Sequence, residues 1–127
     1  MALSKTARTL VASAANTASS TTRGTLDLNS KYGGTLSIKM TNGGTGPTIQ
    51  CQANVLVAHN ASLPTAASAG TDWKTMTSIG GGTANNGITE LVIPIPASTM
   101  CLEVEFTGNT GQSVTVESYF SELTSPF

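Results

Sequence analysis

The chain has 127 residues and a mass of 12.9 kDa, which is enough for one domain with a sizeable buried core. Charged residues make up only 10% of it and its net charge is -1, so it lacks the basic surface with which proteins bind nucleic acid or anionic membranes. We expect neither partner. The polar surface must consist of hydroxyls and amides, and a near-neutral surface does little to prevent association, so we expect the protein to live in an assembly.

Residues 1–22 are rich in Ala, Ser and Thr, and they favour one short strand through Leu10 with loose residues on both sides. They lack the unbroken apolar stretch of a secretory signal, which indicates a protein made and used without export. Two interpretations stay open: a fraying terminus, or an arm that lies on a neighbouring subunit, ahead of a β-sandwich domain at 23–127. The arm interpretation predicts these interface residues: Leu3, Lys5, Arg8, Leu10 and Val11.

Short runs that alternate between apolar and polar residues follow at 23–28, 35–41, 48–59, 72–79 and 88–93, and each predicts a β-strand. The run at 48–59 becomes apolar on both faces near its end, at Leu56 and Ala58, which predicts a central strand. Pro94 should stop the run at 88–93, because proline cannot donate to a ladder. The period also assigns core positions, among them Leu36, Ile38, Met40, Val55, Val57, Val92, Leu102, Val104 and Phe106.

Two loops separate these strands. The segment 60–71 is a loop of Ala, Ser, Pro and Gly, and the segment 80–87 is rich in glycine and asparagine. The second loop has almost nothing in its sequence to hold it down. We therefore expect it to be mobile or to serve in contacts.

The stretch 99–123 consists of two alternating runs around a turn cluster near 108–112 and predicts a β-hairpin in which Phe106 faces Val114 and Val104 faces Val116. The same register puts Glu103 opposite Glu117, which is unfavourable. Either the pairing slips, or this acidic face meets a cation such as Lys39, Lys74 or a basic group of a partner. We expect the face itself to be a solvated outer face.

Seven or eight short strands without a helical pattern predict an all-β fold, an antiparallel β-sandwich. Strand order does not follow from spacing, so jelly-roll and immunoglobulin-like topologies both stay open. Cys51 and Cys101 could bridge two sheets, but without an export signal we expect two buried free thiols.

The chain shows no constellation for catalysis. His59 is the one histidine, no nucleophile elbow is present, and we expect no enzymatic activity, cofactor or metal. Trp73, Tyr119 and Tyr32 could form an aromatic platform for sugar. For Trp73 we favour burial in the core, because large aromatic residues dominate burial in small domains.

Four segments carry a resemblance: 22–28 (Thr-Arg-Gly-Thr-Leu-Asp-Leu), 32–34 (Tyr-Gly-Gly), 41–49 (Thr-Asn-Gly-Gly-Thr-Gly-Pro-Thr-Ile) and 108–117 (Gly-Asn-Thr-Gly-Gln-Ser-Val-Thr-Val-Glu). From about residue 21 onward the chain resembles small virion structural proteins of tailed bacteriophages. Proteins of this size in that group look like capsid decoration (cement) proteins, which sit on the outer shell as trimers.

The resemblance implies a non-enzymatic protein that stabilises the head by bridging major capsid subunits. Its partners would be the major capsid protein and further copies of itself, and its location would be the virion, assembled in the host cytoplasm. Two alternatives stay open: a neck or tail ring component, and a carbohydrate- or receptor-binding module on the virion that uses Trp73 or the glycine loop.

Overall fold

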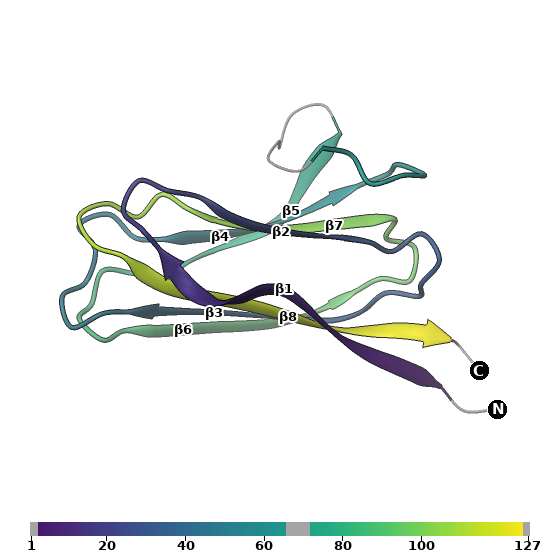
Figure 1. Cartoon of the computed structure of the whole chain (residues 1–127), viewed down its shortest axis with the longest axis horizontal. Helices are drawn as coiled ribbons and strands as arrows, with labels where there is room; N and C mark the ends of the chain where they lie inside the picture. The colour runs from purple at the N-terminus through teal and green to yellow at the C-terminus, as the bar shows by residue number, and fades with distance from the viewer. Residues whose placement is uncertain (1–2, 66–71, 126–127) are drawn as a thin grey trace.

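The computed structural model describes residues 3–65 and 72–125, and these form two four-stranded antiparallel sheets packed face to face (Figure 1). Sheet A contains β1 (Ser4–Asn16), β3 (Gly34–Asn42), β6 (Ile88–Ile95) and β8 (Val114–Ser125). Sheet B contains β2 (Thr22–Asp27), β4 (Gln52–Ala58), β5 (Trp73–Gly80) and β7 (Cys101–Thr107). The expected antiparallel β-sandwich is confirmed. Over the described ranges there is no helix long and apolar enough to cross a membrane.

The strand order identifies the topology. Sheet A runs β1-β8-β3-β6 and sheet B runs β2-β7-β4-β5. The first strand therefore pairs with the last, the second with the seventh, the third with the sixth and the fourth with the fifth. This nested pairing is the jelly roll, which resolves the choice between the two topologies that the sequence left open.

The core lies between the sheets and follows the period of two. On β3, Leu36, Ile38 and Met40 are buried while Ser37 and Lys39 alternate with them, as predicted. The facing strands supply the rest of this main cluster, which includes Ala53, Val55, Leu102, Val104, Phe106, Val114, Val116 and Phe120. As predicted, β4 is a central strand with apolar side chains on both faces near its end.

The predicted hairpin at 99–123 is wrong. Strand β7 pairs with β2 and β4 in sheet B, whereas β8 pairs with β1 and β3 in sheet A. Val104 and Val116 thus belong to one core but approach it from opposite sheets. Alternation fixes which side chains face the core, but it does not say whether the next strand lies beside the first or across from it.

A buried asparagine pair holds the crossing between β7 and β8. The Asn109 side-chain amide donates to the carbonyl oxygens of Asn16 and Gln112, at 2.9 Å each. The Asn16 amide in turn donates to Asn109 Oδ1 at 2.6 Å. Gly108 and Gly111 flank the pair with φ of 94° and 82°, which glycine adopts at little cost. The turn is thereby fixed to the end of β1.

The expected solvated acidic face is also wrong. Glu103 lies opposite Thr25 and Leu56, not Glu117, and it is fully buried. The cation on this face is Arg23 of β2, whose Nη1 lies 3.6 Å from Glu103 Oε2. Arg23 also binds Glu105. A carboxylate buried this deeply requires a paired charge, and the neighbouring edge strand provides it.

The N-terminal residues do not form a loose arm. Instead of one short strand through Leu10, β1 extends from Ser4 to Asn16 and pairs with β8 along its length. Leu10 and Val11, only 9% and 5% exposed, are part of the main core. A Cβ on Gly24 would overlap the Leu10 carbonyl oxygen, so β1 passes directly over β2 and closes one side of the sandwich. The polar segment orders because β8 supplies its ladder partners.

Two further predictions need correction. Pro94 does not end β6, which continues to Ile95, because an edge strand can turn a missing N–H toward solvent. The predicted strand at 48–59 is confined to 52–58, and Ile49 before it is exposed.

The glycine loop at 80–87 is anchored, contrary to the expectation that nothing holds it. The Asn42 side chain donates to the carbonyl oxygens of Gly82 and Ala84, at 3.3 and 2.9 Å. Gln50 Oε1 accepts the backbone N–H of Gly82 at 3.0 Å. Of the other predicted loop, 60–71, residues 66–71 lie outside the described residues.

Candidate functional site

The two outward faces of the sandwich differ in how they are covered. On sheet B, Trp73, Leu56, Ala58 and Cys101 form a second buried cluster. The Trp73 indole donates to the Thr65 carbonyl oxygen at 3.2 Å, so the segment after β4 folds back over this face. Two hollows on the described surface lie over the other face, on sheet A.

We call this second surface the outer A face, and its residues follow from the register of β1, β8, β3 and β6. Directly opposite residues lie in rows across the strands. The four rows are Ala7-Ser121-Thr35-Pro94, Thr9-Tyr119-Ser37-Val92, Glu117-Lys39-Glu90, and Ala15-Thr115-Thr41-Ile88. Only the third row is charged, and in it Lys39 lies opposite both glutamates.

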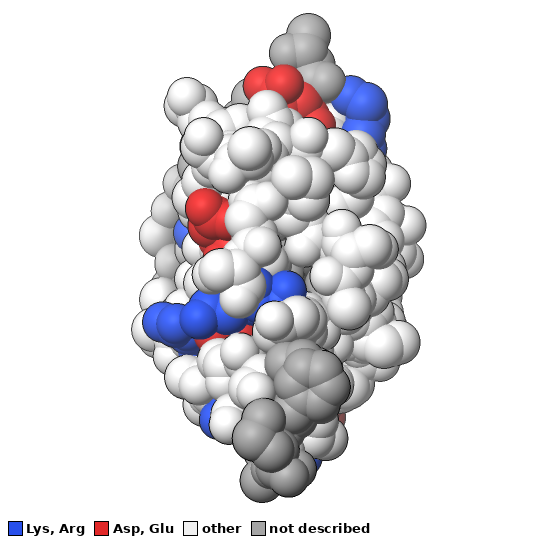
Figure 2. Space-filling view, turned by 90° about the vertical axis from the view of Figure 1, so that its right-hand side faces the viewer, with Lys and Arg blue, Asp and Glu red and all other residues white. Residues whose placement is uncertain are grey.

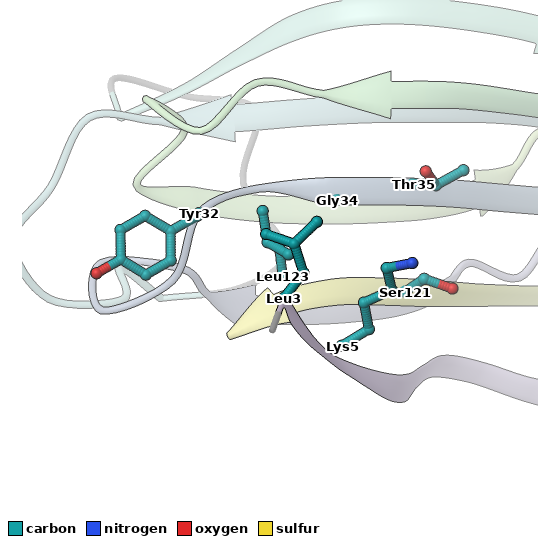
Figure 3. A pocket seen from close by; sticks show the side chains of 7 residues that line it. All are labelled: Leu3, Lys5, Tyr32, Gly34, Thr35, Ser121 and Leu123. Carbon is teal, nitrogen blue, oxygen red and sulfur yellow. The ribbon is translucent and has the colours of Figure 1, made fainter. Parts of the chain in front are cut away.

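Two residues of the first row, Thr35 and Ser121, line an open hollow of about 550 Å³ (Figure 3). Gly34, next to Thr35 on β3, also lines it. Figure 3 shows Leu3 and Leu123 close together, with Tyr32, from the β2–β3 connection, beside them. Lys5 also lines the hollow and is its one charged group. The walls are mostly apolar, which suits a partner's uncharged side chain.

Gly34 is required at this position. A Cβ there would overlap the Ser121 carbonyl oxygen and would lie 2.9 Å from the Phe120 ring. The close approach of β3 to β8 at the hollow therefore depends on the absence of a side chain.

A smaller hollow of about 270 Å³ lies over the charged row, between Lys39, Glu90, Glu117, Val92 and Tyr119. A hydrogen bond with the Glu117 side chain raises the pKa of the Tyr119 phenol, and burial and the carboxylate charge act in the same direction. Tyr119 is therefore a neutral hydrogen-bond donor at physiological pH.

Large apolar side chains stand exposed on this face. Val92 is 65% exposed, Ile88 60% and Tyr119 40%. Leu3 and Tyr32, at the larger hollow, are exposed to a similar extent. Figure 2 shows one end of the molecule, where small clusters of acidic and basic groups lie within a mostly uncharged surface. Grouped apolar residues on a weakly charged surface are typical of interaction sites.

The structure separates the five predicted interface residues. Leu3 and Lys5 line the larger hollow. Arg8 Nε lies 3.2 Å from Glu122 Oε2, a carboxylate whose side chain is only 2% exposed. Leu10 and Val11 are in the core, so no neighbour can reach them without unfolding β1.

Sequence reasoning missed Val92, which it assigned to the core. The residues of β6 are apolar in both phases, so the period could not decide which phase faces inward. The observed phase buries Ile95 and half-buries Leu91 and Ile93, leaving Ile88 and Val92 outside. Tyr119 could have been assigned to the outward face from its alternation with Ser118 and Phe120 on β8.

Other candidate residues are placed as predicted. Trp73 is buried, although in the second cluster and not in the main core, and His59 is exposed directly after β4. Cys51 and Cys101 are buried free thiols. Burial raises the pKa of Cys51 to about 11, and burial followed by the charge of Asp27 raises that of Cys101. No three potential metal ligands gather anywhere in 3–65 or 72–125.

No family model matches the chain, and no curated protein matches it. Among solved structures, it is similar to the K3 cleaved adhesin domain of Lys-gingipain from Porphyromonas gingivalis W83, with 14% identity over 86% of this chain and 71% of that one, at a TM-score of 0.54. A further structural neighbour is the SPBc2 prophage-derived protein YomS, with 17% identity over 95% of this chain and 96% of that one, at a TM-score of 0.45. The first likeness shows a shared fold alone, and the second is too weak to add to it.

Proposed function

We propose that this protein is a non-enzymatic structural protein of a tailed-phage virion, and that it acts as a capsid decoration protein bridging major capsid subunits. The observation that carries the proposal is the outer A face. It combines exposed Val92, Ile88 and Tyr119 with a mostly apolar hollow and a single charged row among its four, which has Lys39 between two glutamates. The resemblance of the turn and strand motifs to phage virion proteins supports the same function.

The energetics of docking favour such a face. Each 100 Å² of apolar surface removed from water contributes about 2.5 kcal/mol before the costs of association. Burying charged groups would offset this gain, but only one of the four rows of the outer A face is charged, and in it Lys39 lies opposite both Glu90 and Glu117. A protein that binds the assembled lattice, and not the free subunits, stabilises the head by mass action.

The jelly-roll topology agrees with this proposal by association. Eight-stranded jelly rolls recur in viral capsid and lectin domains. A fold by itself does not assign a function, so the proposal depends on the residues of the outer A face.

A second candidate is a receptor- or carbohydrate-binding module on the virion. The exposed rings of Tyr32 and Tyr119 favour it, as does the fold shared with a domain described as an adhesin. The form of this idea that used Trp73 loses its basis, because that ring is buried. Binding of host polysaccharide by the intact protein, abolished by Tyr119→Ala, would support the module.

Immunogold labelling of intact virions, with antibody raised against the purified protein, tests the leading proposal. We expect gold particles over the head, at many sites per virion. Label confined to the neck or tail would instead support the alternative that the protein is a neck or tail ring component. Virions that carry none of the protein would contradict a structural role altogether.

A further inference from the structure

Three of the four edge strands of the sandwich carry a feature that discourages pairing with another chain. Strand β1 has register shifts at three points against β8 and packs on β2. Strand β2 is short, with six residues, and β1 packs against it. Strand β5 has a register shift against β4 and carries Lys74. Bulges, short length, lysine and cover are the usual protections of an edge.

The fourth edge, β6, lacks these four protections, and its edge-protecting residue is Pro94, next to its C-terminal end. It has eight residues and pairs with β3 without a register shift. Glu90 is its one charged residue, and Ile88 and Val92 are its most exposed side chains. Such a regular, apolar edge with free backbone groups is a template for another strand.

Pro94 indicates which backbone groups face outward along this edge. A proline within a paired strand has its nitrogen directed away from the neighbouring strand. Backbone groups alternate in direction along a strand, so Ile88, Glu90 and Val92 also direct their N–H and C=O groups away from β3. These are the groups available to a partner.

We propose that β6 pairs antiparallel with β6 of a second copy about a two-fold axis at Leu91, joining the two A sheets into one. An axis at Glu90 would set that carboxylate against its own mate, which is unfavourable. An axis at Val92 would place Glu90 opposite Pro94, which cannot donate. An axis midway between two residues would shift the register by one residue, so the outer face of one copy's sheet would continue into the inner face of the other copy's sheet.

The axis at Leu91 avoids the first and third faults, and it moves Pro94 to the end of the ladder, opposite Ile88 of the second copy. It places Glu90 opposite Val92 of the second copy, and both direct their backbone groups toward the partner, so they exchange two hydrogen bonds on each side of the axis. Leu91 meets its own mate at the axis. The two outer A faces then form one continuous surface, which doubles the area with which the assembly can dock.

A two-fold pair differs from the trimer that the resemblance favours, and it does not depend on where in a virion the protein sits. Native mass by light scattering after size exclusion should be twice the 12.9 kDa of the chain. A monomer over the accessible concentration range would overturn the pairing and leave the edge for a strand of another protein. A trimer would also overturn it, because three copies cannot all be joined through one two-fold edge.

Cysteine cross-linking tests the register. We expect Leu91→Cys to form a disulfide-linked dimer on oxidation, because the two Cβ atoms at the axis would lie about 4.5–5.5 Å apart. The matched control is Ile93→Cys, a half-buried aliphatic residue on the same strand face, whose mate would lie about 13 Å away. The wild-type chain controls for its own cysteines, both buried.

The pattern of cross-links decides the outcome. Efficient linkage of Leu91→Cys without linkage of Ile93→Cys supports the proposed axis. Linkage of both variants, of Ile93→Cys alone, or of neither would overturn the register. The native mass of the wild-type protein decides the pairing itself even where a variant folds poorly.

Discussion

Individual polar side chains fix this fold at points where the chain crosses between sheets. Asn109 and Asn16 bind each other across 93 positions of sequence, and Asn42 binds the glycine loop. All three asparagines are buried. Asn16 and Asn109 have hydrogen-bond partners that offset the cost of removing their amides from water, whereas Asn42 is satisfied at its amide nitrogen but not at Oδ1. Their hydrogen bonds hold specific segments together in a chain that has few ion pairs.

At the same scale, Tyr119 should titrate late. Its pKa is raised by the hydrogen bond with Glu117, so the phenol keeps its proton above the ordinary value of about 10. A raised folded-state pKa contributes stability that is present below the unfolded pKa and is lost as pH rises through the folded one. An ultraviolet titration of the Tyr32→Phe variant, in which Tyr119 is the remaining tyrosine, measures this pKa directly.

The matched variant adds Glu117→Gln to Tyr32→Phe. We expect its tyrosine to ionise at lower pH than in Tyr32→Phe alone, because the carboxylate charge and acceptor are gone. Two superimposable titration curves would mean that Glu117 does not act on Tyr119, and the account of the smaller hollow would need revision.

At the scale of elements, the sequence predicted strands better than neighbours. The sequence predicted β3 and β5 well. Strand β3 has a clear apolar phase, and β5 begins with a large buried aromatic residue, Trp73. The neighbours of β7 and β8 were not predicted, because the same inward pattern fits a hairpin within one sheet and a crossing between two. Only a short strand through Leu10 was predicted at β1, and its full length was missed because its order comes from pairing with β8, which local propensity does not contain.

The candidate site was predictable only in part for the same reason. Leu3 and Lys5 were identified, but as parts of an arm and not of a hollow. The hollow depends on residues from β1, β3 and β8, which are far apart in sequence, and it becomes visible only once the register is known.

The role of β1 leads to a prediction about Leu10 and Leu3. Leu10→Ala should lower the free energy of unfolding by about 2–4 kcal/mol, because Leu10 is buried in the main core. Leu3→Ala, the matched control at an exposed position of the same segment, should change it by less than about 0.5 kcal/mol. Urea denaturation followed by circular dichroism measures both values. A small, equal effect of the two changes would restore the interpretation of the segment as a loose arm.

At the scale of the whole molecule, the outward faces of the two sheets differ. The second cluster, with Trp73, covers one end of sheet B, and hydrogen-bonded polar side chains, among them Gln52, Asn54 and Ser78, occupy another part of it. The outer A face combines exposed apolar residues with hydroxyls and one charged row, in which Lys39 lies opposite Glu90 and Glu117. We infer from this difference that sheet A faces the partner and sheet B does not.

The most direct test is co-sedimentation of the purified protein with undecorated capsid shells of its phage, comparing Tyr119→Glu with Met76→Glu. Both place a carboxylate at an exposed apolar position, the first on the outer A face and the second on sheet B. We predict saturable binding of the wild-type protein, binding weakened about tenfold or more by Tyr119→Glu, equivalent to about 1.4 kcal/mol, and little change with Met76→Glu. Failure of the wild-type protein to sediment with shells, or equal binding by the two variants, would contradict the account.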